Sequence, residues 1–363
     1  MPGEFDVWIP HRLRAETADC RWLHVGDTRF TDPFFEETTS RCLSLPENSY
    51  GPPRITPLSR LPEIAAACDA VEPSAFVFHV SRCGSTLVSQ LLGLDDACIM
   101  LSEVPFFDEL LRARFKPELA EKVDVATLLP AAIRLHARKR TGGERSLVVK
   151  LDSWHAGFHA ELRALYPRTP FILLYRHPAA VVRSHRKLPG MGSVSGLIED
   201  AVFGFDAAES AARPWDTHLP RVLAFYYATF LAIARTDPRA LLVPYAPDMI
   251  PAVEAMASFS GIGISAEHRV KMRARVAFHA KHPQEKFSEG PIEDAAGDAL
   301  RTCVERYEEL ERFREASVSA SRFRRAAEIE GGNAGDDFDH CREIGRRVHT
   351  LRPAVGMGLT IFQ

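Results

Sequence analysis

The stretch that most constrains the fold runs from residue 75 to residue 92. Residues 75–80 are apolar and rich in β-branched and aromatic side chains, which predicts a buried strand. Residues 81–86 are small or polar and include Gly84, which predicts a turn. Leucines at positions 87, 91 and 92 then recur at helical spacing. A strand therefore passes through a short turn directly into a helix.

This turn has the composition of an anion-binding loop. The first N–H groups of the following helix have no partner inside it, and the helix dipole adds positive potential at the same place. Arg82 adds a cation there, while Ser85 and Thr86 add hydroxyl donors. An ordinary turn capped by Ser85 would have the same composition. A nucleotide-hydrolysing P-loop would place lysine directly before Ser85, but Gly84 stands there and the cation comes earlier.

At these residues the chain resembles the sulfotransferases that depend on 3′-phosphoadenosine 5′-phosphosulfate (PAPS). Their 5′-phosphosulfate loop follows a strand and reads Arg/Lys-x-Gly-Ser/Thr-Ser/Thr. The matching residues here are Arg82, Cys83, Gly84, Ser85 and Thr86, with Leu87 continuing the helix. The resemblance implies that residues 82–87 hold the donor PAPS, and that adenosine 3′,5′-bisphosphate (PAP) is the product.

A second motif lies about 90 residues further on. Residues 170–175 form an apolar run that predicts a strand, Arg176 follows it, and Pro178 suits the first turn of a helix. Ser184 comes eight residues after Arg176. In the family, an arginine and a serine at this spacing hold the 3′-phosphate, for which arginine offers a planar donor fork. Either residue alone would be read as ordinary surface; the pair at this spacing strengthens the resemblance.

Glu103 is the first candidate for the general base. It follows a predicted strand at residues 98–101 and lies 21 residues after Arg82, close to the catalytic glutamate of several sulfotransferase branches. Glu103 could instead only favour the first turn of the next helix.

Polar residues also end the predicted strand at 146–150. Lys150 would contact the bridging oxygen of the donor or be a plain surface lysine, and ligands in such sheets bind at the carboxyl ends of strands. The cytosolic branch of the family carries its base histidine near this point, where alignment on Lys150 places Asp152 instead of His155. The base therefore stays open among Glu103, Asp152 and His155.

Composition limits the function classes. The chain has 363 residues with a formal net charge of −3, 46% hydrophobic and 26% charged residues, which is ordinary for a globular protein and gives no basic field for nucleic acid. Its seven cysteines include no Cys-x-x-Cys pair, which favours reduced thiols in the cytoplasm and argues against a zinc site. The most apolar run, 222–234, is too short to span a bilayer, so we expect no integral membrane segment.

Strands and helices alternate along the chain, with a fifth strand expected at 240–245. This order predicts an α/β fold with a mostly parallel sheet, helices on both faces and a likeness to P-loop NTPases. We expect an irregular N-terminal arm (1–73), a sulfotransferase-like domain (74–290) and a helical C-terminal extension with a tail (291–363). Helices are expected over 125–139, 194–213, 221–235, 251–259, 267–276 and 294–313. The basic run 269–286 would be a lid over the nucleotide or a solvated face.

The sequence thus predicts a PAPS-dependent sulfotransferase that moves a sulfuryl group to an acceptor hydroxyl or amine. Glu103 would be the base, and Arg82, Lys150 and the loop N–H groups would stabilise charge on the leaving phosphate; no metal is needed. The alternatives are an ATP-dependent small-molecule kinase and a non-catalytic PAP-binding protein. The acceptor class (small molecule, sugar, lipid or peptide) and the oligomeric state stay open.

Overall fold

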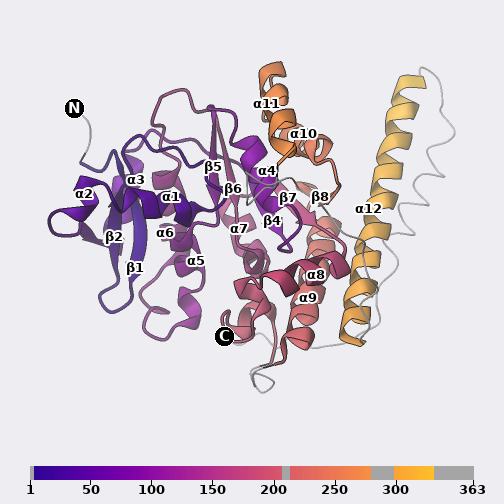
Figure 1. Cartoon of the computed structure of the whole chain (residues 1–363), viewed down its shortest axis with the longest axis horizontal. Helices are drawn as coiled ribbons and strands as arrows, with labels where there is room; N and C mark the ends of the chain where they lie inside the picture. The colour runs from indigo at the N-terminus through magenta and orange to yellow at the C-terminus, as the bar shows by residue number, and fades with distance from the viewer. Residues whose placement is uncertain (1–3, 207–212, 279–297, 331–363) are drawn as a thin grey trace. The chain divides into compact units, whose positions relative to one another are not determined.

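A five-stranded parallel sheet forms the centre of the fold. The computed structural model describes residues 4–206, 213–278 and 298–330. The sheet has the order β5-β6-β4-β7-β8, and every neighbouring pair is parallel (Figure 1). Its strands are β4 (Pro73–His79), β5 (Cys98–Ser102), β6 (Ser146–Lys150), β7 (Phe171–Tyr175) and β8 (Ala240–Pro244). The five predicted strands and the parallel α/β class are confirmed.

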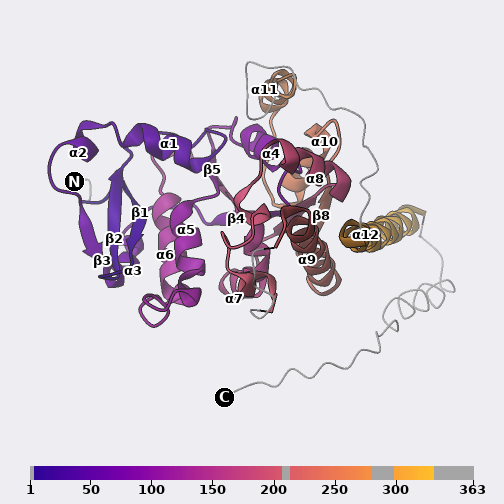
Figure 2. The same cartoon turned by 60° about the horizontal axis from the view of Figure 1, so that its bottom comes forward.

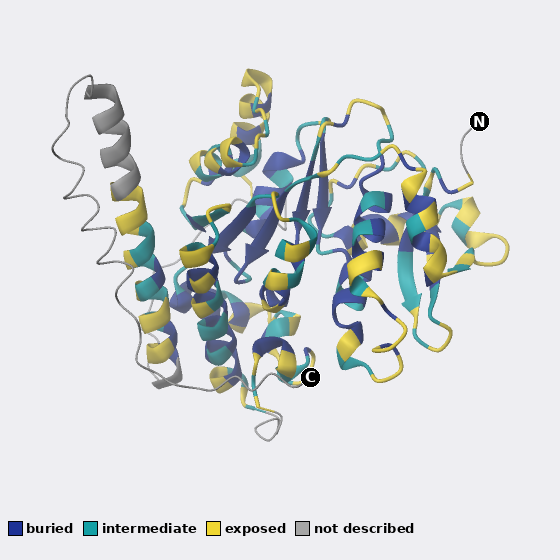
Figure 3. Cartoon of the chain, turned by 180° about the vertical axis from the view of Figure 1, so that it is seen from behind, coloured by how far each residue is buried: buried dark blue, intermediate teal, exposed yellow. Residues whose placement is uncertain are grey.

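Helices cover both faces of this sheet. Figure 2 shows α4 (Ser85–Leu92) on one side, with α7 (His159–Leu165) and α9 (Trp215–Thr236) on the other. After β4 the chain crosses the sheet toward β5, and after β6 it crosses in the opposite direction toward β7. Because both crossover connections are right-handed, their helices lie on opposite faces of the sheet. The strands β4, β5, β6 and β7 are mostly buried, as the dark ribbons of Figure 3 show, whereas the edge strand β8 is only half-buried. Continuous apolar runs are typical of parallel strands covered on both faces.

The N-terminal region is not an irregular arm, so that expectation was wrong. It contains a three-stranded antiparallel sheet of β1 (Trp8–Arg14), β2 (Asp19–His24) and β3 (Ile55–Pro57). The same region contains three short helices, α1 (Phe35–Cys42), α2 (Pro46–Ser49) and α3 (Leu61–Ala66). Pro46 and Pro62 lie in the first turns of α2 and α3, Pro57 ends the edge strand β3, and Pro10 lies at the irregularity in the register of β1; a missing N–H is tolerated at such positions. Glu109 fastens the sheet by accepting a 2.6 Å hydrogen bond from the Leu13 N–H.

The remaining helices are α5 (Pro105–Leu111), α6 (Val125–His136), α8 (Pro178–Lys187), α10 (Ile250–Phe259), α11 (Ala266–Val276) and α12 (Asp298–Glu330). Short 3-10 turns are η1 (Leu58–Arg60), η2 (Ala113–Phe115), η3 (Ser153–Phe158), η4 (Met191–Ser193) and η5 (Asp200–Phe203). The helix expected over 194–213 is wrong for 194–206, where Gly196 and Gly204 adopt positive φ and interrupt the backbone. Residues 207–212 lie outside the described part, as do 279–286 of the basic run.

The chain divides into two compact units, Met1–Glu311 and Arg312–Gln363. The first unit includes the start of α12, where Leu300, Cys303 and Leu310 are buried. Within the described residues, no helix is both long and apolar enough to cross a membrane. The domain boundaries at 73 and 290 remain predictions.

Candidate active site

The predicted anion loop lies between β4 and α4 and has an unusual backbone. Ser81, Arg82 and Gly84 have φ angles of 65°, 48° and 84°. Such conformations cost energy for residues other than glycine and cluster at functional sites. The first helical bond of α4 runs from the Val88 N–H to Gly84 O at 3.0 Å, so the N–H groups that precede it have no acceptor within the helix. The loop therefore offers backbone donors at one place.

Gly84 is required by its surroundings as well as by its backbone. A Cβ at this position would lie 3.0 Å from Cδ2 of Tyr245, closer than side chains normally approach. From the sequence alone, a Cβ at Gly84 would be expected to obstruct the anion. The structure adds a different neighbour, the aromatic ring that follows β8.

Arg176 of the second motif contacts this loop. Arg176, directly after β7, donates a 3.2 Å hydrogen bond from Nη1 to Arg82 O, and its guanidinium carbon lies 4.1 Å from the centre of the Tyr245 ring. Tyr227 holds the Arg176 carbonyl through a 2.7 Å hydrogen bond from its hydroxyl. Arg82 and Arg176 are thus more than 90 residues apart in the sequence but in direct contact in the fold.

Arg82 itself donates from Nη2 to the Leu188 carbonyl. Its Nε is buried and has no hydrogen-bond partner in the described part of the chain. A buried donor of this kind costs free energy unless a ligand accepts from it. Arg82 therefore fits an anionic group at the loop.

The other loop residues have separate roles. Ser85 and Thr86 are buried in the first turn of α4, and Leu87 is half-buried. The Cys83 thiol faces the core, donates to Leu174 O at 3.4 Å, and has a pKa raised to about 11 by burial. Only the backbone of Cys83 can therefore serve a ligand. Ser184 lies half-buried in α8, near the end of that helix.

The catalytic candidates Glu103 and Lys150 come together at the same edge of the sheet. Glu103 follows β5, and its N–H donates to Lys150 O at 2.8 Å. Its Oε1 lies 2.6 Å from Lys150 Nζ, and the lysine side chain is fully buried. Glu103 has a φ of 58°, a strained value for a residue with a side chain. The two residues form a partly buried ion pair in which Lys150 is fully buried, so Lys150 is not a plain surface lysine.

His79 completes this group and was missed by the sequence analysis. It is the last residue of β4, and its Nδ1 accepts a 3.1 Å hydrogen bond from the Ser81 N–H. The neutral ring therefore carries its proton on Nε2, which lies 3.2 Å from Glu103 Oε1. The sequence shows a polar residue at or just after the end of each of three strands, but only the sheet order makes these strands neighbours and brings the three residues to one edge.

Electrostatics fix the protonation state of Glu103. Burial would raise its pKa, but the charge of Lys150 and the contact with His79 outweigh this and place the pKa well below its usual range. Burial also lowers the pKa of His79 and keeps the ring neutral. Glu103 is therefore an ionised but weakly basic carboxylate while Lys150 stays against it.

The remaining base candidates belong to a neighbouring network. Asp108 Oδ1 accepts hydrogen bonds from Trp154 Nε1 at 2.6 Å and His155 Nε2 at 3.0 Å, and Arg112 pairs with Oδ2 at 2.9 Å. His155 is buried, and its Nδ1 accepts from the Asp152 N–H at 3.2 Å. These bonds indicate that His155 supports the turn at η3.

Asp152 differs from Glu103 in the direction of its pKa shift. Burial, followed by the charges of Glu103 and Asp108, raises its pKa well above its usual range. Ligand atoms of Asp108, Asp152 and His155 lie within 4.8 Å of one another, a spacing compatible with a metal ion. Asp108 is already neutralised by Arg112, however, which is typical of a hydrogen-bonded cluster.

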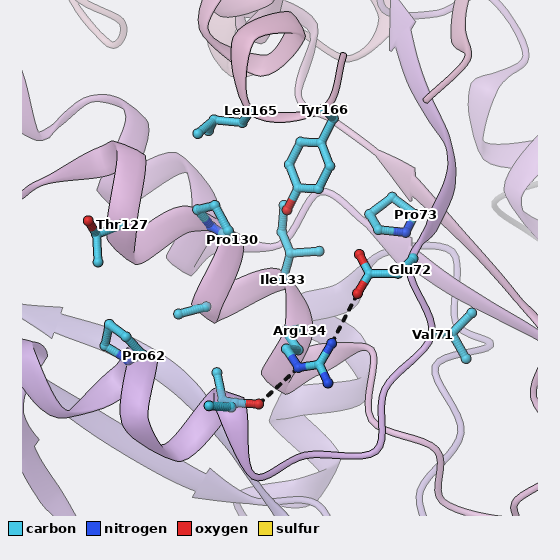
Figure 4. Close-up of a pocket in the computed structure, with 13 residues that line it drawn as sticks. Pro62, Val71, Glu72, Pro73, Thr127, Pro130, Ile133, Arg134, Leu165 and Tyr166 are labelled. Atoms are coloured by element: carbon cyan, nitrogen blue, oxygen red, sulfur yellow. Dashed lines mark hydrogen bonds and ion pairs between the residues drawn. The ribbon is translucent and has the colours of Figure 1, made fainter. Parts of the chain in front are cut away.

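A cavity of about 470 Å³ lies away from this site, between α3, α6 and α7 (Figure 4). Its wall includes Pro73, the first residue of β4, whereas the anion loop follows the last residue of that strand. Another, of about 360 Å³, is lined by Arg29, Gln90 and Arg275 among others. Neither is lined by Arg82, Glu103 or Lys150.

Comparison with known proteins gives only structural likenesses, since no family model and no curated protein matches the chain. The chain is similar to the sulfotransferase STF9 from Mycobacterium avium, with 16% identity over 68% of this chain and 78% of the other (TM-score 0.42). It is also similar to the sulfotransferase domain of the Synechococcus olefin synthase, with 15% identity over 67% and 95% (TM-score 0.39). Mouse sulfotransferase SULT7A1, complexed with PAP, shares 14% identity over 61% and 69% (TM-score 0.33). Identities this low leave the chemistry to be argued from the residues of the site.

Proposed function

We propose that this protein is a sulfotransferase that takes a sulfuryl group from PAPS and passes it to an acceptor hydroxyl or amine. The observation that carries the proposal is the meeting of three features at one sheet edge. These are the anion loop with its unpartnered Arg82 Nε, the Arg176 side chain against that loop, and the Glu103–Lys150 pair.

The donor would lie with its 5′-phosphosulfate on the loop. The N–H groups at the start of α4 and the Arg82 guanidinium would bind its negative oxygens. Arg176 and Ser184 would hold the 3′-phosphate, which distinguishes PAPS from its 3′-dephospho analogue. When bound, the donor supplies an activated sulfuryl group.

The acceptor would be activated by Glu103. The carboxylate would take the proton of the acceptor as the acceptor oxygen or nitrogen forms its bond to sulfur. The bond between sulfur and the bridging oxygen breaks, and its electron pair stays on the 5′-phosphate of PAP. Lys150 and Arg82 would stabilise the charge that develops there.

Lys150 would have two roles in this scheme. Against Glu103 it lowers the basicity of the carboxylate. Turning toward the leaving phosphate would free Glu103, whose pKa would rise toward the range in which a carboxylate accepts a proton effectively. His79 would hold Glu103 in position during this exchange.

The test is acceptor-dependent release of PAP. Labelled PAPS is incubated with the protein and a panel of alcohols, phenols, sugars, lipids and peptides, and both PAP and sulfated product are measured. Transfer to any acceptor supports the proposal. PAP binding without transfer to any acceptor would favour a non-catalytic binder, and tighter calorimetric binding of ATP than of PAP would favour a kinase.

A further inference from the structure

Exposed apolar side chains gather on one segment beside the anion loop. Twelve large apolar residues are exposed among the described residues, and four of them fall within Leu188–Leu197, which we call the apolar loop. They are Leu188, Met191, Val194 and Leu197, with exposures between 38% and 60%. Scattered apolar residues on a surface need no explanation, but a cluster of this kind marks an interaction surface.

The turns of the apolar loop bring these side chains together. The Val194 N–H donates to Met191 O at 3.1 Å, and the Leu197 N–H donates to Val194 O at 3.3 Å. The first and fourth residues of such a turn lie within about 7 Å of each other. Met191, Val194 and Leu197 are therefore successive neighbours on the surface.

The apolar loop is held in place by bonds along its length. Arg82 donates to the Leu188 carbonyl, and Arg112 Nη2 donates to Leu197 O at 3.2 Å. In the middle of the loop, Trp215 Nε1 donates to the Ser193 hydroxyl oxygen at 3.4 Å. Because both ends and the middle are tied to the protein, its exposed apolar side chains belong to an ordered surface.

The segment that leads into the apolar loop is positively charged. Arg186 and Lys187 directly precede it and are exposed, and no described acidic side chain pairs with either. The acids that follow it are neutralised, because Glu199 pairs with Arg112 at 2.6 Å and Asp200 pairs with Arg213 at 3.1 Å. Two available cations therefore lie next to the apolar cluster.

We propose that the apolar loop, together with Arg186 and Lys187, docks this protein on an anionic lipid surface. Apolar side chains beside cations match the acyl boundary and the charged headgroups of such a surface. Since Leu188 is bonded to Arg82, docking would bring the anion loop close to the bilayer. The proposal requires only this surface and stands apart from the proposed sulfuryl transfer.

The test is co-sedimentation of the full chain with vesicles. One set contains phosphatidylcholine alone, and the other contains phosphatidylcholine with about one third phosphatidylglycerol. We expect binding to the second set, weakened by added salt. Replacing Arg186 and Lys187 by serine should reduce it by roughly five-fold per cation. The control pair Lys122→Ser and Arg273→Ser removes the same charge from exposed positions elsewhere and should have little effect.

The apolar contribution is tested by the double variant Met191→Gln and Leu197→Gln. It should also lose vesicle binding, while Val270→Gln, which changes a 65% exposed residue of α11, should not. Thermal unfolding checks that each variant is folded, and the charge variant remains informative if the apolar one is not. Wild-type protein that ignores anionic vesicles, binds neutral ones equally well, or loses binding equally in loop and control variants would overturn the proposal. So would self-association through the loop without vesicle binding.

Discussion

The carboxylate of Glu103 and the ammonium group of Lys150 lie 2.6 Å apart at the ends of two neighbouring parallel strands. Removing one partner of a buried pair leaves the other charge uncompensated, which is strongly destabilising. The same pair keeps Glu103 ionised at neutral pH and limits its basicity. The contact therefore links stability to the proposed chemistry, and variants must be judged by both.

We expect Glu103→Gln to reduce turnover by roughly 10²–10⁴-fold with little change in PAP affinity, because the amide cannot accept the acceptor proton. Steady-state kinetics and calorimetry measure the two effects. Glu118→Gln, an exposed change outside the site, is the control. If turnover survives in Glu103→Gln but is lost in Asp152→Asn or His155→Ala, the base is that residue instead.

His79 offers a pair of variants that separate its two contacts. Asparagine can replace Nδ1 as the acceptor for Ser81, whereas glutamine reaches toward the position of Nε2, which faces Glu103. We expect His79→Asn to lower kcat by about 10- to 100-fold, because it removes the polar contact of Nε2 with the charged carboxylate, and His79→Gln to lower it less.

The pH profile distinguishes positioning of Glu103 from simple support of the fold. Since His79 lowers the pKa of Glu103, its loss should move the acidic limb of the kcat/KM profile to higher pH. A fall in kcat without any movement of this limb would show that His79 does not act through Glu103.

The sequence predicted the central sheet, and it pointed to most residues of the candidate site, because those features are local. Apolar runs identify the strands, and polar residues after them identify the reactive edge. His79 was missed because its neighbour Glu103 is set by the strand order β5-β6-β4, which no local pattern contains. The contact of Tyr245 with Gly84 was missed for the same reason, because it also depends on the order of the strands. The N-terminal sheet was missed because β3 is short and pairs with β2 across some 30 residues.

Gly84→Ala should weaken PAP binding more than ten-fold. Its φ of 84° costs alanine about 1–2 kcal/mol, and its Cβ would also press on the Tyr245 ring. Gly142→Ala is a matched control, since Gly142 has a φ of 79° but no atom within 4 Å of an added Cβ. Calorimetric PAP binding that is equal in folded Gly84→Ala and Gly142→Ala proteins would contradict a role for this close contact.

Arg176→Ala should weaken PAP binding about ten- to a hundred-fold, and Ser184→Ala by less, as expected for a charged and a neutral hydrogen bond. AMP has no 3′-phosphate, so Ser184→Ala should leave its affinity unchanged. Arg176 also contacts the loop and Tyr245, so Arg176→Ala should weaken AMP binding as well. Calorimetric affinities of each variant for PAP and for AMP test these expectations, with Arg186→Ala as the control. Equal losses for PAP and AMP in Ser184→Ala would exclude a 3′-phosphate site there.

The pH dependence of stability gives a last prediction, for Asp152→Asn. Burial and the charges of Glu103 and Asp108 raise the pKa of Asp152 above its unfolded value of about 3.9. A group with a raised pKa contributes stability that is fully present below its unfolded pKa and is lost as pH rises through its folded pKa. Asparagine removes this loss and can still cap η3. We therefore expect Asp152→Asn to be more stable than wild type at pH 7, with a difference that shrinks toward pH 4.

Urea unfolding between pH 4 and pH 8 measures this difference. Glu103→Gln should behave in the opposite way, because a lowered pKa contributes stability that is present above the unfolded value of about 4.3 and is lost as pH falls. It should therefore be less stable than wild type at pH 7 and approach it in acid. Asp152→Asn that is destabilised at pH 7 would mean that the Asp152 carboxylate is ionised and bonded in the fold, which contradicts the raised pKa.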